Sequence, residues 1–276
     1  MKQFSEVVTQ MTNLSEHKPV RIPQTHTEFL QWQCDTYNAS QGDLQGYDCP
    51  ECLNRGYFEL IRDDTSFMRE CRCMKIRRNL ERLKKAGFIG QSERFTFENY
   101  RASSEWQKKA KATAERYVNE NPDKWLFFGG QSGCGKTHLC TAVCMELIRQ
   151  EHDVKYVQWR DIVHYLEANR FKEEKYSSKI TELKDIEILY IDDFLKTTHK
   201  IREKPAPSET EMNIAYEIIN ARVVSGNKTI ISSEMHVRDI SCLDEATGGR
   251  ISENSEGFQI QINYQENRNY RFFGKD

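Results

Sequence analysis

The chain has 276 residues, enough for one or two domains with a large core. Hydrophobic residues make up 38% of it and charged residues 30%, which is typical of a protein with a broad solvated surface. The net charge of −2 argues against a wholly basic nucleic-acid-binding protein but is compatible with local basic patches. No apolar run approaches the ~18 residues of a membrane span, and the N-terminus lacks the apolar core of a signal peptide. We therefore expect a cytoplasmic protein that does not enter a membrane.

The first quarter of the chain contains two closely spaced cysteine pairs. Residues 1–45 are mostly polar, with weak helical signals, and predict a helical or flexible segment. Residues 46–75 hold a C-x-x-C and a C-x-C pair, separated by a segment that predicts a strand and an Asp-Asp turn. Zinc takes four deprotonated ligands at tetrahedral corners, and two such pairs can supply them. We expect a closed, structural zinc module with the ligands Cys49, Cys52, Cys71 and Cys73.

Other assignments of these cysteines remain open. The C-x-C pair has the less usual spacing, so His26 or Cys34 could replace one ligand. A disulfide framework and unrelated free thiols are the two further alternatives. The placement of Cys134, Cys140 and Cys144 in a predicted loop and buried helix favours reduced thiols.

A basic connector, residues 76–95, follows the cysteine module. Residues 71–85 contain seven basic side chains and one acidic one, Glu81, and the leucine spacing predicts a helix. This excess of positive charge could bind phosphate or an acidic partner. The alternative is a solvated linker helix.

Residues 96–276 form the expected second domain, which contains a phosphate-binding loop. A helix over 106–118 and a strand over 124–128 precede the loop, which fits G-x-x-x-x-G-K-[S/T] without a mismatch. Glycines allow backbone N–H groups to close on a polyphosphate. Lys136 can reach the β- and γ-phosphates, and the Thr137 hydroxyl can bind Mg²⁺. We expect ATP or GTP to be bound by Gly130, Gln131, Ser132, Gly133, Cys134, Gly135, Lys136, Thr137 and His138.

The helix after the loop is predicted to be buried along one side. Leu139, Val143 and Leu147 repeat every four residues, and a second apolar row lies beside them. Strand, glycine loop and helix therefore follow in the order that a phosphate-binding loop needs, with the positive end of the helix directed at the anion.

A second acidic element lies downstream. A strand over 154–159 precedes a helix that we expect to begin at Ile162 with Asp161 as its cap. The strand over 186–191 ends in Asp192-Asp193. Asp192 would hold Mg²⁺ through water, and Asp193 would orient or deprotonate the attacking water. The alternative is a strand that ends in an ordinary Asp-rich turn.

The last third predicts further alternation of helices and strands. Residues 196–208 are basic and contain prolines, which predicts an exposed mobile loop. A helix over 211–222, a strand over 228–234 and an alternating edge strand over 258–262 follow. Strands that alternate with helices predict an α/β fold with a parallel sheet.

These motifs together resemble those of a known family. From residue 95 onward the chain is similar to the AAA+ ATPase domain of bacterial and phage helicase loaders of the DnaC/DnaI type, which are related to IstB-type transposition ATPases. The matching residues are the phosphate loop, Ile191-Asp192-Asp193, residues 229–234, Gly249-Arg250-Ile251 and Asn269-Tyr270-Arg271. The cysteine pairs resemble the zinc-binding, helicase-interacting domain of DnaI-type loaders. The resemblance implies an α/β AAA+ P-loop ATPase fold with a central parallel sheet, preceded by a small zinc-binding domain.

The resemblance also implies roles for residues outside the phosphate loop. Ser233, or alternatively Ser232, would be the sensor that positions the lytic water beside Lys136, Asp192 and Asp193; relatives carry Asn where this chain has Glu234. Arg250 resembles an arginine finger that acts on a neighbouring subunit, although some loaders place that arginine where Asn254 stands. Arg271 matches a sensor arginine that acts in its own subunit. Either arginine could instead be an ordinary surface residue.

By the same resemblance, the chain would load a hexameric DnaB-type helicase onto single-stranded DNA during replication initiation. It would form an ATP-dependent homo-oligomer and bind the helicase through the zinc domain, with ATP, Mg²⁺ and Zn²⁺ as cofactors. Candidate contacts to single-stranded DNA are Arg170, Lys172, Lys175, Tyr176 and Lys179. These residues could equally form a solvated helix face. A transposition-targeting ATPase and a non-hydrolysing nucleotide-binding adaptor or inhibitor are the alternative functions.

Overall fold

The computed structural model describes residues 23–85, 94–197, 200–201, 204–265 and 269. The chain divides into two compact units, Met1–Met74 and Lys75–Asp276. The weak helical signals near the N-terminus and the predicted sensor Arg271 lie outside the described residues. In the described part of the chain, no helix combines the length and apolarity that crossing a membrane requires.

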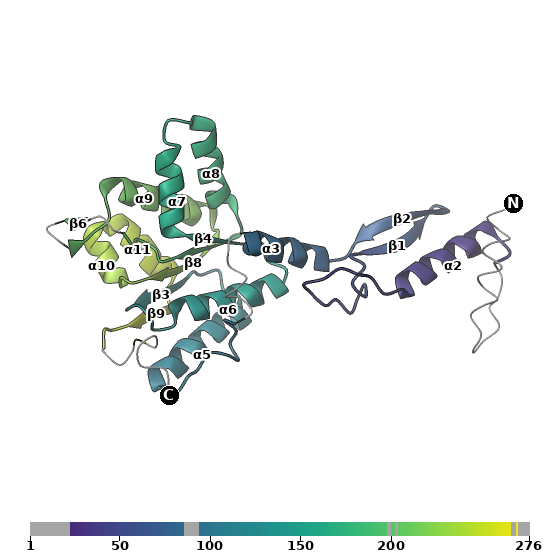
Figure 1. The fold of residues 1–276 in the computed structure, drawn as a ribbon, viewed down its shortest axis with the longest axis horizontal. Helices are drawn as coiled ribbons and strands as arrows, with labels where there is room; N and C mark the ends of the chain where they lie inside the picture. Colours follow the sequence, from purple (N-terminus) through teal and green to yellow (C-terminus); the bar gives the residue numbers. More distant parts are fainter. Residues whose placement is uncertain (1–22, 86–93, 198–199, 202–203, 266–268, 270–276) are drawn as a thin grey trace. The chain divides into compact units, whose positions relative to one another are not determined.

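The first unit consists of a helix packed on a two-stranded hairpin. The hairpin pairs β1 (Tyr57–Arg62) antiparallel with β2 (Thr65–Glu70), which confirms the predicted strand and turn (Figure 1). Asp63 and Asp64 form the turn with φ of 49° and 53°, as left-handed two-residue hairpin turns require. Helix α2 (His26–Ala39) is joined to β1 by two hydrogen bonds between the Asn38 side chain and the Glu59 backbone, at 2.8 and 3.0 Å.

The second unit is built on a five-stranded parallel sheet. Its strands are β3 (Leu126–Gly130), β4 (Val154–Gln158), β5 (Ile188–Asp192), β8 (Lys228–Ser233) and β9 (Gln259–Ile262), in the order β4-β5-β8-β3-β9. Every neighbouring pair is parallel, and β9 lies at an edge, as predicted. Strands β3, β8 and β5 are neighbours in this order and run parallel, so their carboxyl ends lie at the same edge of the sheet.

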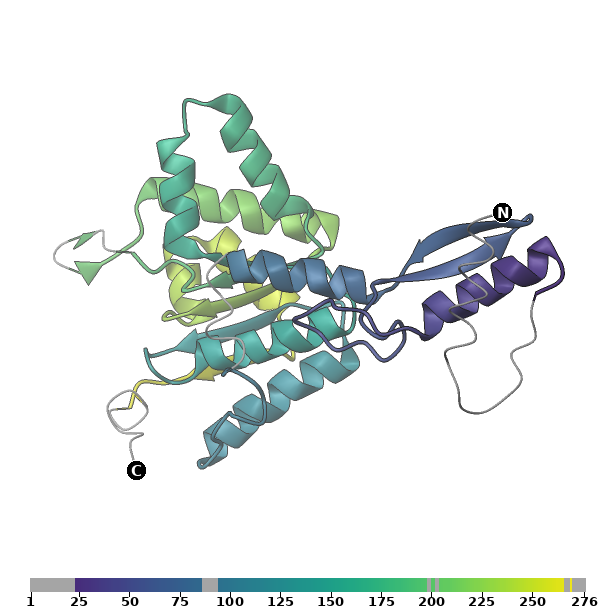
Figure 2. The same ribbon diagram turned by 45° about the vertical axis from the view of Figure 1, so that its right-hand side comes forward.

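Helices cover both faces of this sheet (Figure 2). Helix α6 (Lys136–Arg149) packs on one face and contacts α5 (Glu105–Glu120). Its two predicted apolar rows are fully buried, which confirms them. The other face is covered by α7 (Trp159–Ala168), α8 (Glu173–Asp185), α9 (Glu209–Ser225), α10 (Val237–Leu243) and α11 (Glu245–Asn254), whose apolar side chains share one core cluster with strand residues.

One local prediction is wrong, and one predicted loop contains a short strand pair. Helix α7 begins at Trp159 after an N-cap at Gln158, so Asp161 lies in the first turn and does not cap the helix. The early start follows from the burial of Trp159, whose ring packs edge-on against Phe194 at 4.9 Å between centroids. Within the predicted loop 196–208, the backbone forms a short antiparallel pair, β6 (Lys200–Ile201) and β7 (Lys204–Pro205).

The predicted basic helix is α3 (Cys73–Lys85), and much of its charge is compensated. Lys75 and Arg82 both contact Asp153, at 3.8 and 3.4 Å. Just before the helix, Arg72 forms an ion pair with Glu51. The sequence count of seven bases to one acid therefore overstates the charge that the segment offers to a partner.

Arg222 connects several elements of the second unit from a fully buried position. Its guanidinium donates to the Thr229 hydroxyl at 2.9 Å and to the carbonyls of Leu183 and Ile186 at 2.9 and 2.8 Å. Burial lowers its pKa to about 10, so the side chain still carries its charge at neutral pH. Through these contacts Arg222 joins α9 to the end of α8 and to β8.

Candidate functional site

The phosphate loop runs from the end of β3 into α6, and its glycines are needed for steric reasons. Gly133 and Gly135 have φ of 78° and 92°, which side-chain-bearing residues rarely adopt. A Cβ at Gly133 would lie 2.1 Å from Asn269 Oδ1, and one at Gly135 would lie 2.9 Å from the Tyr100 ring. The backbone of this loop is therefore closely approached from two sides, and its N–H groups can line a concave anion site.

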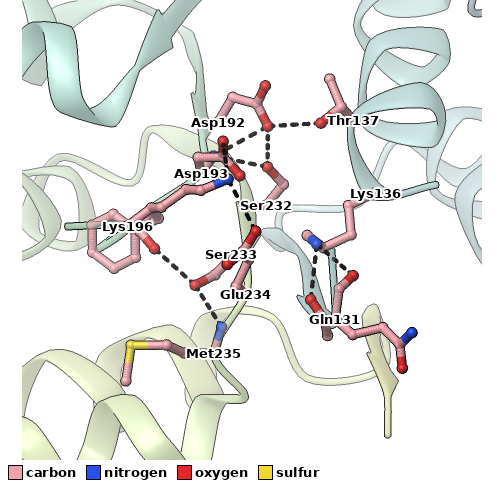
Figure 3. A network of polar contacts seen from close by, with 12 residues as sticks. Gln131, Lys136, Thr137, Asp192, Asp193, Lys196, Ser232, Ser233, Glu234 and Met235 are labelled. Carbon is pink, nitrogen blue, oxygen red and sulfur yellow. Dashed lines mark hydrogen bonds and ion pairs between the residues drawn. The ribbon is translucent and has the colours of Figure 1, made fainter. Parts of the chain in front are cut away.

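Lys136 is directed back into this loop. Its side chain is only 5% exposed, and its ammonium donates to the carbonyls of Gly130 at 2.8 Å and Gln131 at 2.9 Å (Figure 3). A bound polyphosphate could take over these hydrogen bonds, because an anionic oxygen is a stronger acceptor than a carbonyl.

Thr137 and Asp192 meet at the end of the sheet. The Thr137 hydroxyl donates to Asp192 Oδ1 at 3.2 Å, across from α6 to β5. Asp192 Oδ1 also accepts from Tyr190 at 2.9 Å and from Ser232. Burial next to the Asp192 carboxylate raises the Tyr190 pKa, so this phenol remains a donor. A hydroxyl and a carboxylate are hard oxygen ligands, which is the donor chemistry that Mg²⁺ prefers.

Asp193 forms part of a second charged group beside Asp192. Lys196 Nζ lies 3.1 Å from Asp193 Oδ2 and 3.0 Å from Glu234 Oε1. Burial lowers the Lys196 pKa, but the hydrogen bonds and charges of Glu234 and Asp193 outweigh that effect and raise it. Burial raises the Glu234 pKa, and Lys196, Lys136 and Ser132 reverse this and lower it. Lys196 and Glu234 are therefore both charged at neutral pH.

The two serines at the end of β8 have different contacts. Ser232 donates to Asp192, and its oxygen accepts from the Asp193 backbone N–H at 3.1 Å. Ser233 donates to the Phe194 carbonyl at 2.8 Å and accepts from the Met235 N–H at 3.1 Å. Ser232, the alternative sensor, thus faces the carboxylates, while Ser233 stabilises the turns on either side. The sensor role of Ser233 stays a prediction.

An aromatic group borders the first turn of α6. The His138 ring stacks on Phe95 with centroids 4.7 Å apart and meets Tyr100 edge-on at 5.2 Å. Its Nε2 lies 2.8 Å from the Thr96 carbonyl. Burial, helped by the Lys111 charge, lowers the His138 pKa despite this hydrogen bond. Phe95 and Tyr100 were not predicted as site residues, and no local signal marks them, because helix α5 and strand β3 separate them from the loop in sequence.

The predicted arginine finger is held against its own subunit. Arg250 Nη1 donates to the Ala246 carbonyl at 3.0 Å, and its guanidinium lies 5.2 Å from the Tyr216 ring centroid. Asn254, the alternative position, donates to the Arg250 carbonyl at 2.8 Å. These contacts fix the helix α11 around Arg250 and leave its proposed action on a neighbour as a prediction.

The candidate nucleic-acid contacts lie on α8 and on the connection between α7 and α8, and they are not equivalent. Tyr176 donates to Glu217 at 3.3 Å, and Lys179 lies 2.8 Å from Glu182. Phe171, which the sequence analysis missed, is 95% exposed, and the Arg170 guanidinium lies 5.7 Å from its ring centroid. An aromatic residue between Arg170 and Lys172 was the sequence signal for this position.

The four predicted zinc ligands come together in the first unit. Their sulfur atoms all lie within 4.8 Å of one another, and all four residues are buried. Burial raises the Cys52 pKa, but hydrogen bonds from the Gly56 N–H and the neighbouring thiols outweigh it and lower the pKa to about 7. In the described residues, neither His26 nor Cys34 joins this cluster. Burial raises the pKa of the neighbouring Cys71 thiol, so the support for Zn²⁺ is the geometry: four clustered cysteine sulfurs are a donor set that structural Zn²⁺ sites use.

The cysteines are separate thiols and not disulfides. The Sγ atoms of Cys49 and Cys71 are 3.8 Å apart, and those of Cys52 and Cys73 are 3.5 Å apart. A disulfide requires a sulfur–sulfur distance of about 2.05 Å. The described cysteines are accordingly free, which contradicts the disulfide alternative.

Fold and site together define an α/β P-loop protein, with a phosphate loop at the end of one central strand and an acidic pair at the end of another. The chain belongs to the family of IstB-like ATP binding proteins, whose sequence model matches residues 55–240. This confirms the resemblance stated from the motifs.

Individual relatives agree with this family. The phage-like element PBSX protein XkdC of Bacillus subtilis (strain 168) is 26% identical over 237 residues, which is 81% of this chain and 85% of XkdC. The replicative helicase loader DnaC of Escherichia coli (strain K12) is 31% identical over 140 residues, which is 49% of this chain and 56% of DnaC. The chain thus spans most of XkdC and about half of DnaC. Among solved structures, the DnaC helicase loader aligns with a TM-score of 0.49 at 19% identity, over 62% of this chain and 96% of that one.

Proposed function

We propose that the chain is an ATP-dependent loader that binds a hexameric DnaB-type replicative helicase and helps to place it on single-stranded DNA when replication starts. The observation that carries the ATPase part is the contact of Thr137 with Asp192, which brings the phosphate loop and the acidic strand end to one point. The loader part is supported by the relative named as a replicative helicase loader.

The residues of the site would divide the work of hydrolysis. Lys136 and the loop backbone would bind the β- and γ-phosphates, and Thr137 and Asp192 would hold Mg²⁺, which supplies positive charge to the phosphate oxygens when bound. Asp193 would accept a hydrogen bond from the attacking water and orient it. Arg250 would reach the γ-phosphate of a neighbouring copy, so full activity would require an oligomer. Arg271 would complete the set from its own subunit.

The first unit would bind the helicase. Its four buried cysteines would hold a structural Zn²⁺. Two of these cysteines precede the hairpin and two follow it, so the ion would hold the two ends of the hairpin together. Residues 1–45, 46–75 and 76–95 would then serve as N-terminal segment, zinc module and connector, with the ATPase domain over 96–276.

Single-stranded DNA would bind at the connection between α7 and α8. Phe171 offers an exposed ring on which a base can stack, and Arg170 and Lys172 flank it with positive charge. Lys175 can add a phosphate contact. Tyr176 and Lys179 would have to exchange their bonds with Glu217 and Glu182, so we expect smaller contributions from them.

Affinity capture of the replicative helicase from the same host tests this proposal. The chain should retain the purified helicase, and retention should change between ATP and no nucleotide. A variant with Cys49→Ser should lose the helicase while still binding ATP, because the second unit carries the nucleotide site. Absence of a complex under both conditions would contradict the loader function.

A transposition-targeting ATPase is the second candidate, and the family match favours it. Such a protein would bind duplex DNA and a transposase. Competition between a duplex and a single strand of the same sequence distinguishes the two functions. Preference for the duplex would support this candidate over the loader.

A non-hydrolysing adaptor or inhibitor is the third, and the ion pair of Asp193 with Lys196 is the observation in its favour. In an adaptor, Lys136→Ala would abolish function and Asp193→Asn would leave it intact. A loader that cycles through hydrolysis would lose function in both variants.

A further inference from the structure

The ion pair between Lys196 and Glu234 lies close to the phosphate loop, and the roles expected for the motif residues do not account for it. Glu234 comes directly after β8, and Lys196 follows the turn after β5. Figure 3 shows the Glu234 side chain between the ammonium groups of Lys196 and Lys136. The phosphate loop also contributes, because Ser132 helps to lower the pKa of the Glu234 carboxyl.

The turn that carries Lys196 has a fixed and strained backbone. Asp193 and Leu195 have φ of 53° and 59°, a left-handed conformation that is strained for residues other than glycine. Phe194 and Leu195 are 0% and 2% exposed, and the Phe194 N–H donates to the Ser232 carbonyl at 2.8 Å. Buried anchors therefore hold the turn in the shape that directs the Lys196 ammonium toward the carboxylates of Asp193 and Glu234.

Glu234 itself is chemically unsuited to bind a phosphate. An ionised carboxylate only accepts hydrogen bonds, and its charge repels a phosphate oxygen. Lys196 has the opposite properties, with three donors and a positive charge on a flexible stem. Its side chain is 38% exposed, which leaves the ammonium accessible.

We propose that Lys196 is a further residue that contacts the terminal phosphate of a bound nucleoside triphosphate, in addition to Lys136, and that Glu234 competes with this phosphate for the Lys196 ammonium group. This inference rests on the proposed function of the phosphate loop as a triphosphate site. When a terminal phosphate takes the place of Glu234, the carboxylate leaves Lys196 and Ser132. Glu234 lies two residues before His236, which caps α10, so the exchange connects the phosphate to the α10–α11 pair that carries Arg250.

Equilibrium binding of fluorescent ADP and of a non-hydrolysable ATP analogue tests this inference. In Lys196→Met, affinity for the analogue should fall by about 10-fold or more, as expected for the loss of one charge-assisted hydrogen bond, while affinity for ADP should change less than about 2-fold. Lys196→Arg should recover part of the loss. In Glu234→Gln, affinity for the analogue should rise, because the competing charge is gone.

The pair Lys184–Glu217 is the matched control. It is an ion pair of 2.7 Å with similar exposure, 29% and 39%, and it lies between α8 and α9. Lys184→Met and Glu217→Gln should leave both affinities unchanged. Equal loss of ADP and analogue affinity in Lys196→Met, or no loss of either, would overturn the inference. Failure of the unaltered chain to bind either nucleotide would overturn the proposed function as well.

Discussion

Under the proposed function, nucleotide binding would depend most directly on Lys136, because its buried ammonium lies at the loop carbonyls that flank the expected phosphate position. Lys136→Ala should weaken binding of an ATP analogue by about 100-fold, within the range expected for losing a buried, hydrogen-bonded charge. Asp193→Asn should keep binding within about 3-fold and lower the hydrolysis rate by about 100-fold, the minimum attributed to general-base assistance. Nucleotide titration and phosphate release measure the two effects. Loss of hydrolysis without loss of binding in Lys136→Ala would contradict these roles.

His138 gives the second unit a dependence on pH. Its pKa is lowered by burial, so between its ordinary value of about 6.5 and the lowered folded value the unfolded chain binds the proton more readily. The free energy of unfolding therefore decreases as the pH falls through this window. The variant His138→Phe, which keeps an aromatic ring between Phe95 and Tyr100, should lose less stability between pH 7.5 and 5.5 than the unaltered chain. Urea unfolding at both values checks this, and equal losses would show that His138 is not the group responsible.

Among single residues, the sequence predicted those that belong to a motif, but it did not predict the contacts that depend on the backbone conformation of a turn. The loop residues and Asp192 follow from spacing, because the ends of parallel strands meet at one edge. The choice between Ser232 and Ser233 depends on strand register, since neighbouring side chains point to opposite faces. The Lys196 contact depends on the left-handed backbone at Asp193 and Leu195, which no residue type there indicates.

Among the elements, the junction of α8, α9 and β8 depends on Arg222. Arg222→Met should lower the free energy of unfolding of the second unit by about 3 kcal/mol or more, because several buried carbonyls lose their donor at once. Arg149→Met is the control; its exposed pair with Glu146 should contribute less than about 1 kcal/mol. Denaturant unfolding measures both, and equal effects would show that Arg222 is dispensable.

We expect the folding of the first unit to depend on its cysteine cluster, as we expect the stability of the second unit to depend on Arg222. Metal analysis should find about one zinc per chain, and Cys49→Ser should release it and unfold the hairpin and α2. Cys34→Ser, a change at a buried thiol outside the cluster, should keep the zinc. Circular dichroism measures the folding of both variants, and metal analysis measures their zinc content. A folded first unit without metal would contradict the structural role.

The sequence indicated the hairpin and the sheet but not every helix. Alternating strands and the Asp-Asp turn carry local signals, and both were confirmed. Helix α2 was not predicted as such because Cys34 is its one buried residue, so no apolar stripe marks it. The start of α7 was misplaced because burial of Trp159, a tertiary effect, outweighed the capping preference of Asp161.

For the whole molecule, the phosphate loop alone would describe many nucleotide-binding proteins. The family match narrows this to the IstB-like ATP binding proteins, and one relative of the chain is named as a replicative helicase loader. The four-cysteine cluster supports the proposal that a separate unit binds a partner, and Arg250 supports the proposal that several copies of the chain assemble. These features support a nucleotide switch whose state determines whether a helicase is held.

Transfer of the replicative helicase onto a covalently closed circle of single-stranded DNA tests this account most directly. A circle has no ends, so a closed helicase ring needs assistance to enclose it. We predict that the chain with ATP increases the amount of helicase on the circle, and that Lys136→Ala does not. No increase with the unaltered chain, or an equal increase with Lys136→Ala, would contradict an ATP-dependent loader.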